Sequence, residues 1–311
     1  MPLCTLMFAI VAVLAAVGLS PAQAAATPLL TQPRCAGPAP SVDVFKAGGL
    51  PLADWRENLE FDGRGRLWVS HINNSQVEGY DASGRLVATI PVPSPGGIRR
   101  GVDGLMYVNF GIGPADALTG KPSGLMRFDS TLDRPTASVF ATLPGGINGL
   151  AVDGAGNFYF GREFAPSVLK VRQDGSIDQA WTDAAGVFGT NGVTVLGSEL
   201  YATVLVHPSS PVARVPLADP GAHATVADLS PLPVLPKGLD DLEARGDALY
   251  VTAFVSGELL RVDRATGRTC VLVSGLITPT SVRVPVGFGD ADPARELFVT
   301  EASGRIVRVR T

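Results

Sequence analysis

A repeated pattern in residues 57–311 limits the possible folds more than any other feature of the sequence. Six segments each combine a short alternating strand, a turn rich in Gly or Asp, and a second strand centred on an apolar pair. They begin with ENLEFDGRGRLWVS at 57, GIRRGVDGLMYVNF at 97, NGLAVDGAGNFYFG at 148, NGVTVLGSELYATV at 191, DDLEARGDALYVTA at 240 and TSVRVPVGFGDADPARELFVTE at 280. The starts lie 40 to 51 residues apart, close to the length of one four-stranded propeller blade.

Most copies continue with further strands, such as QVEGYD then LVATIPV, and VLKVRQ then IDQAWTD. The last copy ends after three strands, while the unpaired strand SVDVFKA at 41–47 precedes the first copy. Together these two parts would complete one blade and leave no open sheet edge. We therefore predict an all-β, six-bladed β-propeller with four-stranded blades, closed into a ring by an N-terminal strand. A β-sandwich is the alternative, and no segment keeps a helical period over three turns.

The composition suits one globular domain that acts on small molecules. The chain has 311 residues, of which 46% are apolar and 17% charged, enough to bury a sizeable core. The net charge is -4 and no Lys/Arg run occurs, which excludes the electrostatic footprint of a nucleic-acid-binding protein. We expect residues 41–311 to form a single propeller domain that is monomeric.

The first 25 residues have the layout of a secretory signal peptide, with an apolar run from Leu6 to Leu19 followed by AQAA. This run is shorter than the about 20 residues that a membrane span needs. We predict a signal peptide at 1–25, an N-terminal arm at 26–40, and a secreted or periplasmic protein with no stable membrane span. The remaining cysteines, Cys35 and Cys270, then form a plausible disulfide between the arm and a late strand, with two free thiols as the alternative.

The first residues of the inner strands indicate a polar site at the central channel. Alignment of the copies puts four polar residues at equivalent places: Glu57, Asn148, Asn191 and Asp240. The two remaining copies supply Ile98, or a nearby residue, and Thr280, which are poor ligands. Each inner strand delivers its first residue to the same end of the channel, so these side chains should meet there.

Two carboxylates and two amide oxygens around a narrow axis concentrate hydrogen-bond acceptors, which is costly unless a partner is present. A hard divalent cation removes that cost, and Ca²⁺ prefers these oxygen ligands. No His or Cys occupies the shared position, so zinc and copper are disfavoured. We therefore predict a site for Ca²⁺ or another divalent cation. The second-position residues Asn58 and Asp241 would add a ligand or orient one.

This pattern resembles the regucalcin and gluconolactonase family of calcium-dependent six-bladed propellers, and the related paraoxonases, over essentially the whole chain after the signal. In gluconolactonase-like members a Glu, an Asn and an Asp hold the metal, which the resemblance places on Glu57, Asn191 and Asp240. A further Asn contacts substrate there and corresponds to Asn148. In the paraoxonase-like pattern all four positions are ligands and an adjacent residue joins them, here Asp241. The opening tripeptide is ENL rather than EGP, so the substrate stays open.

The resemblance implies a secreted, metal-dependent hydrolase of a lactone or ester. Its general base could be Asp240, as in gluconolactonases, or a histidine from the loops over the site, His71 or His207. Arg162 would orient an acidic substrate, and Glu163 is a further substrate-binding candidate. G-x-S-x-G and phosphate-binding motifs are absent from the sequence.

Two other functions remain open. The first is a secreted propeller that binds a ligand or protein without turnover, since propellers host many functions. The second is a strictosidine-synthase-like enzyme, which would need a general acid/base in the pocket, with Glu163 and Glu301 available.

Overall fold

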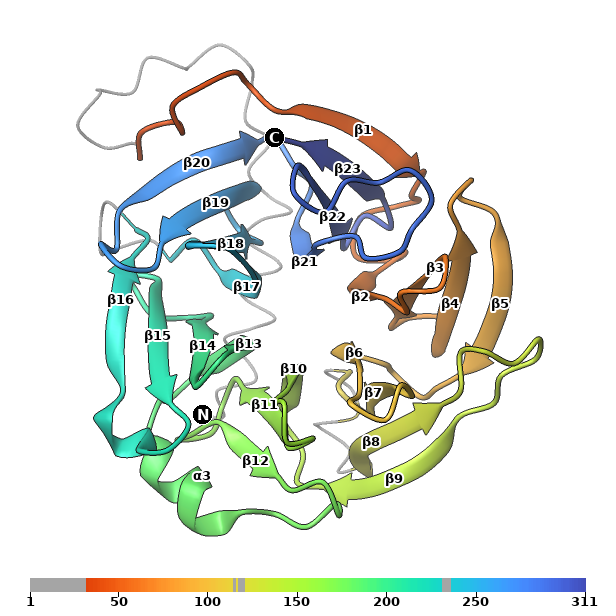
Figure 1. Cartoon of the computed structure of the whole chain (residues 1–311), viewed down its shortest axis with the longest axis horizontal. Helices are drawn as coiled ribbons and strands as arrows, with labels where there is room; N and C mark the ends of the chain where they lie inside the picture. Colours follow the sequence, from red (N-terminus) through yellow and green to blue (C-terminus); the bar gives the residue numbers. More distant parts are fainter. Residues whose placement is uncertain (1–31, 114–115, 117–120, 231–235) are drawn as a thin grey trace. The chain divides into compact units, whose positions relative to one another are not determined.

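The computed structural model describes residues 32–113, 116, 121–230 and 236–311. The predicted signal peptide and residues 26–31 of the arm lie outside this part. Residues 32–311 contain six antiparallel sheets arranged as blades around a central axis (Figure 1). The prediction of a six-bladed β-propeller is therefore confirmed. Within the described ranges, no helix has the length and apolarity to cross a membrane.

The blades follow one another along the chain. Blades 1 and 2 contain β2 (Arg56–Phe61), β3 (Arg66–His71), β4 (Gln76–Asp81), β5 (Leu86–Pro91), β6 (Ile98–Arg100), β7 (Met106–Phe110), β8 (Ser123–Phe128) and β9 (Ser138–Leu143). Blades 3 and 4 contain β10 (Ile147–Val152), β11 (Phe158–Arg162), β12 (Leu169–Val171), β13 (Thr190–Leu196), β14 (Glu199–Val204), β15 (Pro211–Pro216) and β16 (Ala224–Asp228), with helices α3 (Gln179–Ala185) and η1 (Pro220–Ala222). Blades 5 and 6 contain β17 (Leu239–Arg245), β18 (Ala248–Ala253), β19 (Glu258–Asp263), β20 (Thr269–Ser274), β21 (Pro279–Arg283), β22 (Glu296–Glu301), β23 (Ile306–Arg310) and β1 (Ser41–Lys46).

Blade 6 is assembled from both ends of the described chain. Strand β1 pairs antiparallel with β23, with Ser41 opposite Arg310 and Val44 opposite Val307. The sheet order is therefore β1-β23-β22-β21, with the N-terminal strand outermost (Figure 1). This pairing gives blade 6 its fourth strand.

Blade 3 differs from the prediction, because the segment IDQAWTD is not a strand. Its sheet has three strands among the described residues, and residues 179–185 form α3 instead. Asp178 caps this helix by accepting a hydrogen bond from the backbone N–H of Trp181, and Gly186 ends it in the left-handed conformation. Trp181 packs edge-on against Tyr159, with ring centroids 5.1 Å apart. At 7 residues the helix is too short to show a period over three turns.

The apolar pair in each second strand explains how the blades pack. Successive strand residues point to opposite faces of a sheet. Leu67 accordingly lies in the apolar cluster between blades 6 and 1, and Trp68 in the cluster between blades 1 and 2. The same division occurs at Met106–Tyr107, Phe158–Tyr159, Leu200–Tyr201, Leu249–Tyr250 and Leu297–Phe298. Each blade therefore contributes to two interfaces, and six buried clusters form the core.

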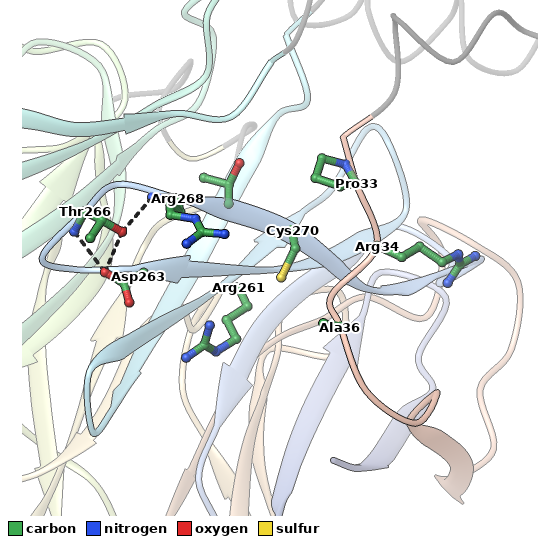
Figure 2. Close-up of a pocket in the computed structure, with 9 residues that line it drawn as sticks. Pro33, Arg34, Ala36, Arg261, Asp263, Thr266, Arg268 and Cys270 are labelled. Atoms are coloured by element: carbon green, nitrogen blue, oxygen red, sulfur yellow. Dashed lines mark hydrogen bonds between the residues drawn. The ribbon is translucent and has the colours of Figure 1, made fainter.

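The N-terminal arm is attached to the outer strand of blade 5. Cys35 and Cys270 form the predicted disulfide. Two backbone hydrogen bonds flank it, from Cys35 N to Val271 O at 3.0 Å and from Val271 N to Pro33 O at 2.8 Å. A pocket of about 390 Å³ lies where the arm crosses β20 (Figure 2). Since β20 is the strand farthest from the axis in its sheet, this pocket is separate from the channel.

Candidate metal-binding site

A β-bulge near the start of the inner strands shapes the candidate site. In β10, Ile147 pairs with Arg162 and Leu150 with Phe160, so two residues of β10 oppose one of β11. The register is interrupted at corresponding places in β2, β13, β17 and β21. The residues at these bulges are Glu57, Asn148, Asn191, Asp240 and Thr280. The four polar residues aligned from the sequence therefore occupy equivalent positions.

The bulge also explains how a carboxylate begins an otherwise regular strand. Regular alternation would put Glu57 on the same side as Leu59, which lies in the apolar cluster between blades 6 and 1. A bulge re-aims the side chain of the extra residue. Because of the bulge, the Glu57 side chain does not point to the apolar face of the strand on which Leu59 lies.

Blade 2 contributes no side chain to this set. Ile98 pairs with Val108 and is fully buried in the core between blades 1 and 2, so it corresponds to Leu59 rather than to Glu57. Counting back two positions puts Gly96 at the level of Glu57. We define the four remaining polar residues as the ring: Glu57, Asn148, Asn191 and Asp240.

Hydrogen bonds hold three members of the ring. Trp55 Nε1 donates to Glu57 Oε2 at 2.5 Å. The Nδ2 atoms of Asn148 and Asn191 both face Glu163 Oε1, at 2.7 and 3.4 Å. Glu163, which follows β11, therefore belongs to the site, although the sequence pattern gave it no place in the ring.

The ring carries uncompensated negative charge. Burial, followed by repulsion from Glu163, raises the pKa of Glu57 to about 7. Burial also raises the pKa of Asp240 well above its usual range, and the carboxylates of Glu57, Asp241 and Glu163 add to this effect. No group in the described part of the chain donates a hydrogen bond to the Asp240 carboxylate. A cation would stabilise the ionised forms of these groups.

The donor atoms fit a hard cation. In the described ranges, no three His, Cys, Asp or Glu side chains lie close enough to hold a metal ion by themselves. A cation here would therefore depend on Glu57 and Asp240 together with the amide oxygens of Asn148 and Asn191. Carboxylate and amide oxygens, completed by water, are the ligands that Ca²⁺ takes.

Asp241 is committed to other partners. Its Oδ2 lies 2.7 Å from Arg283 Nη2, 2.9 Å from Asn58 Nδ2, 2.5 Å from Ser281 Oγ and 3.5 Å from Arg99 Nη2. These donors fill the acceptor sites of that oxygen. Asn58 and Asp241 therefore bind each other, at the second position of their strands, next to the ring.

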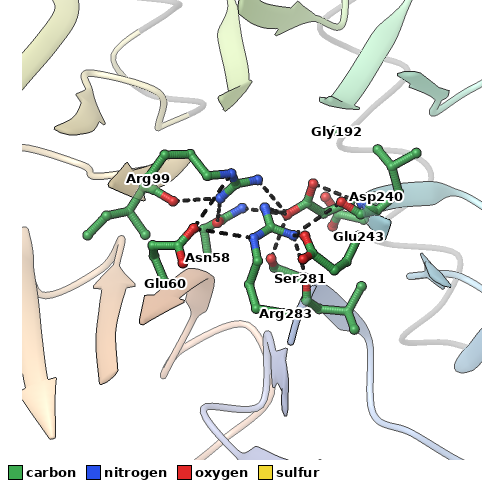
Figure 3. Close-up of polar contacts among 12 residues, drawn as sticks. Asn58, Glu60, Arg99, Gly192, Asp240, Glu243, Ser281 and Arg283 are labelled. Carbon is green, nitrogen blue, oxygen red and sulfur yellow. Dashed lines mark hydrogen bonds and ion pairs between the residues drawn. The ribbon is translucent and has the colours of Figure 1, made fainter. Parts of the chain in front are cut away.

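Arg99 and Arg283 form a second charged cluster, which the sequence analysis missed (Figure 3). Glu60 Oε2 lies 4.0 Å from Arg99 Nε and 3.9 Å from Arg283 Nε, and Glu243 Oε2 lies 3.6 Å from Arg283 Nη1. Burial raises the pKa of Glu60 to about 7 and that of Glu243 to about 8. The sequence could have indicated this cluster, because each member lies three positions after the residue of its inner strand that aligns with Glu57. The pairs are Glu57 and Glu60, Gly96 and Arg99, Asp240 and Glu243, and Thr280 and Arg283.

The two candidate histidines have different surroundings. His71 is buried, with Nε2 at 2.9 Å from Asp54 Oδ1 and Nδ1 at 3.0 Å from Glu78 Oε1. Nδ1 is therefore held by Glu78 of β4, whereas Nε2 lies close to Asp54 but forms no hydrogen bond with the described residues. His207 is exposed, and its Nδ1 lies 3.0 Å from Ser209 Oγ. Neither has an interaction with a ring residue in the described structure.

Arg162 and Glu301 lie near the ends of second strands. Arg162 is partly buried, its Nε has no hydrogen-bond partner among the described residues, and burial lowers its pKa. A negatively charged group could satisfy this guanidinium. Glu301 is buried and binds Arg305 at 2.6 Å and Ser303 at 2.6 Å, so its carboxylate is occupied within blade 6.

A second set of polar residues fixes the backbone of the ring, and the sequence analysis missed it as well. In four blades, a side chain of the second strand donates a hydrogen bond to a carbonyl of the next blade at the ring level. The pairs are Ser70 to Gly96, Asn109 to Asn148, Thr203 to Asp240 and Thr252 to Thr280. The donors stand two residues after the apolar pair, in LWVS, MYVN, LYAT and LYVT, where their common position could have identified them.

An aromatic pair lies beside Glu57. Trp55, which donates to the Glu57 carboxylate, stacks on Phe254 of the β18–β19 connection, with ring centroids 5.6 Å apart. These rings bring together blades 1 and 5, the two blades that supply the ring carboxylates. The pair therefore gives the site an apolar wall next to its charged centre.

Comparisons with known proteins support the fold. No family model and no curated protein matches the sequence. A protein provisionally named a gluconolactonase is 14% identical with a TM-score of 0.62, and the match covers 90% of this chain and 94% of that chain. Regucalcin, a calcium-binding protein from Agrobacterium tumefaciens, is 16% identical with a TM-score of 0.62, covering 86% and 92%. The PQQ-bound aldose sugar dehydrogenase of Streptomyces coelicolor is 16% identical with a TM-score of 0.60, covering 88% and 99%.

At these identities the likeness shows the fold alone. The structural neighbours thus include the gluconolactonase and regucalcin propellers that the sequence pattern resembles. They also include a propeller with a different cofactor, so the site itself must decide between functions.

Proposed function

We propose that this protein is a calcium-dependent hydrolase of a lactone or ester, with Glu57, Asn148, Asn191 and Asp240 as the residues that hold the ion. One observation carries the proposal. These four residues occupy equivalent bulge positions, and the Asp240 carboxylate has a raised pKa and no hydrogen-bond donor among the described residues. The names of the gluconolactonase and regucalcin neighbours agree with this chemistry.

A bound calcium ion would supply Lewis-acid activation of a carbonyl or of water. The chain's own groups provide the rest. Asp240 is our candidate for the proton acceptor, because its carboxylate lies in the ring and has a raised pKa, whereas His71 lies against Asp54 and Glu78 and contacts no ring residue in the described structure. Trp55 holds Glu57 by a hydrogen bond and, with Phe254, forms an apolar wall that excludes water from one side. Arg162, with its unpaired Nε, is our candidate for binding an acidic group of the substrate.

Asp241 has a supporting role in this proposal. Burial raises the pKa of Asp241, and its contacts with Arg99 and Asn58 oppose that shift. Together with Arg283 these contacts fix the carboxylate next to Asp240. We therefore assign it to the charged cluster rather than to the ion.

We also propose that the mature protein works outside the cytosol, in the periplasm or as a secreted protein. The disulfide between Cys35 and Cys270 supports this location, since such bonds persist in oxidising compartments. The signal-like sequence at 1–25 is in agreement.

The experiment is a metal and activity assay on the purified mature chain. Bound metal is measured by elemental analysis, the melting temperature is compared with and without EDTA, and aldonolactones, acyl-homoserine lactones and aryl esters are tested as substrates. We expect calcium to be bound and EDTA to abolish hydrolysis, with the same loss in Asp240→Asn. Asp247→Asn is the matched control, because the Asp247 side chain is 94% exposed.

Three other outcomes are distinct. A protein without bound metal whose stability ignores EDTA contradicts the proposal. Bound calcium without turnover indicates a binding propeller, and condensation of an amine with an aldehyde indicates a strictosidine-synthase-like enzyme. Oxidation of aldoses after addition of PQQ would instead indicate a dehydrogenase.

A further inference from the structure

We infer that Glu163 is a positioning residue that orients the amides of Asn148 and Asn191 so that their oxygens are available to the ion. This inference rests on the proposed function, because it assigns a role in the same ring. Its evidence is separate and comes from the contacts of one loop residue.

The backbone around Glu163 is fastened to the next blade on both sides. Arg162 N donates to Thr190 Oγ1 at 3.0 Å, and Gly189 N donates to Ala165 O at 3.3 Å. These bonds join the end of β11 to the residues that immediately precede Asn191. Glu163 is thereby held between Asn148 of its own blade and Asn191 of the following blade.

The chemistry of the contact defines the orientation of both amides. A carboxyl oxygen that accepts a hydrogen bond must face an N–H, so an amide that donates to it presents its NH₂ group. Both Asn148 Nδ2 and Asn191 Nδ2 are directed at the same atom, Glu163 Oε1, at 2.7 and 3.4 Å. The two Oδ1 atoms are therefore turned away from Glu163, and no donor among the described residues occupies them.

Blade 3 lacks one interblade hydrogen bond that four other blades form to a backbone carbonyl, and Glu163 contacts the Asn191 side chain at that level instead. In blades 1, 2, 4 and 5, a second-strand side chain binds the backbone of the next blade at the ring level. Blade 3 has Gly161 at this place, and a Cβ there would lie 1.6 Å from Asn191 O, so no side chain fits. Asn191 consequently receives no such bond from β11. Glu163, two residues later, holds the Asn191 side chain instead.

The test separates this role from that of a direct ligand. Both amides use a single oxygen of Glu163, and a Gln at 163 can offer one oxygen in the same place, whereas Ala offers none. We expect Glu163→Ala to weaken calcium binding about 10- to 100-fold, as loss of a ligand-orienting partner does. We expect Glu163→Gln to restore most of that loss. Calcium affinity is measured by titration calorimetry on the mature protein after chelation, with Phe164→Ala as control because Phe164 is the exposed neighbour in the loop.

A second measurement needs no metal. In the metal-free protein, hydrogen exchange of the Asn148 and Asn191 side-chain amides should be slow in the wild type and in Glu163→Gln, and faster in Glu163→Ala. Melting curves establish that each variant is folded.

The outcomes are unambiguous. Equal loss of affinity in both Glu163 variants would overturn positioning and indicate a direct ligand or a purely electrostatic effect. Unchanged affinity in Glu163→Ala, or unchanged amide exchange, would also overturn it. A wild-type protein that binds no calcium would refute the proposed function and this role with it, and the wild-type titration identifies that case.

Discussion

Without calcium in the proposed site, the free energy of unfolding of this protein should fall as the pH rises. The pKa of Glu57 in the folded state is raised from its ordinary value of 4.5 to about 7, mainly by burial. Between these two values the folded state binds more protons than the unfolded state, so the free energy of unfolding decreases with increasing pH. For Glu57 alone, the difference between the two pKa values corresponds to about 3 kcal/mol, lost between about pH 4.5 and pH 7.

Calcium should offset this dependence. In the proposed site the ion would bind the ionised carboxylates, so its binding would release protons and its stabilising effect would grow as the pH rises. The assay is urea unfolding at pH 5, 6, 7 and 8, in EDTA and in excess calcium. We expect a falling free energy of unfolding in EDTA and a much flatter profile in calcium.

Variants test how much of the pH dependence of the unfolding free energy comes from the ring carboxylates. Glu60 and Glu243, whose pKa values are raised to about 7 and about 8, titrate in the same range and add to the slope. Glu57→Gln should remove the share that belongs to Glu57, and Asp247→Asn should leave the profile as it is. A free energy of unfolding in EDTA that is flat or increases between pH 5 and pH 7 would refute the reasoning.

Three further perturbations follow from the contacts. Thr203→Val removes a buried hydroxyl that lies 2.8 Å from Gly192 N and 2.5 Å from Asp240 O. We expect the free energy of unfolding in urea to fall by about 2 kcal/mol and calcium binding to weaken. Unchanged values for both would contradict the role of this hydroxyl. Arg283→Met leaves the buried carboxylates of Asp241 and Glu243 without their cation, so the free energy of unfolding at pH 7 should fall by about 3 to 5 kcal/mol. The loss in melting temperature should be smaller at pH 5, where these carboxylates can be protonated, and an equally large loss at pH 5 would contradict this reasoning. Replacing Cys35 and Cys270 by Ser should lower the free energy of unfolding by about 2 to 5 kcal/mol. Calcium affinity, measured by calorimetry, should not change, because the disulfide lies at the outer strand of blade 5. A large loss of affinity would show instead that the arm supports the ring.

Much of the fold and part of the site could be predicted from the sequence. The apolar pairs and their spacing indicated six blades, and the alignment of Glu57 with Asn148, Asn191 and Asp240 matches the bulge positions in the structure. The prediction failed for the IDQAWTD segment, because its residues 179–183 belong to the helix Gln179–Ala185, whose 7 residues are too few to show a period.

Other parts of the site depend on neighbours that are distant in the chain. Asp241 was grouped with the ligands by its position in the strand, and the structure adds that Arg99 and Arg283 approach its Oδ2 atom from blades 2 and 6. The sequence left open whether Ile98 or a nearby residue stands at the ring level in blade 2, and the pairing register puts Ile98 in the core and Gly96 at the ring level. Neither fact can be read from the local sequence, because each is set by pairing between strands or blades.

The sequence by itself determined the number of blades and which strand positions are polar, since both are periodic properties of short segments. The tertiary structure decided which of those polar groups remain without partners. The arrangement of the blades around the axis brings arginines to Asp241 and the Glu163 carboxylate to Asn148 and Asn191. Asp240 receives no hydrogen-bond donor from the described residues. The physical reason is that the cost of a buried charge depends on its neighbours in space, and those neighbours come from different blades.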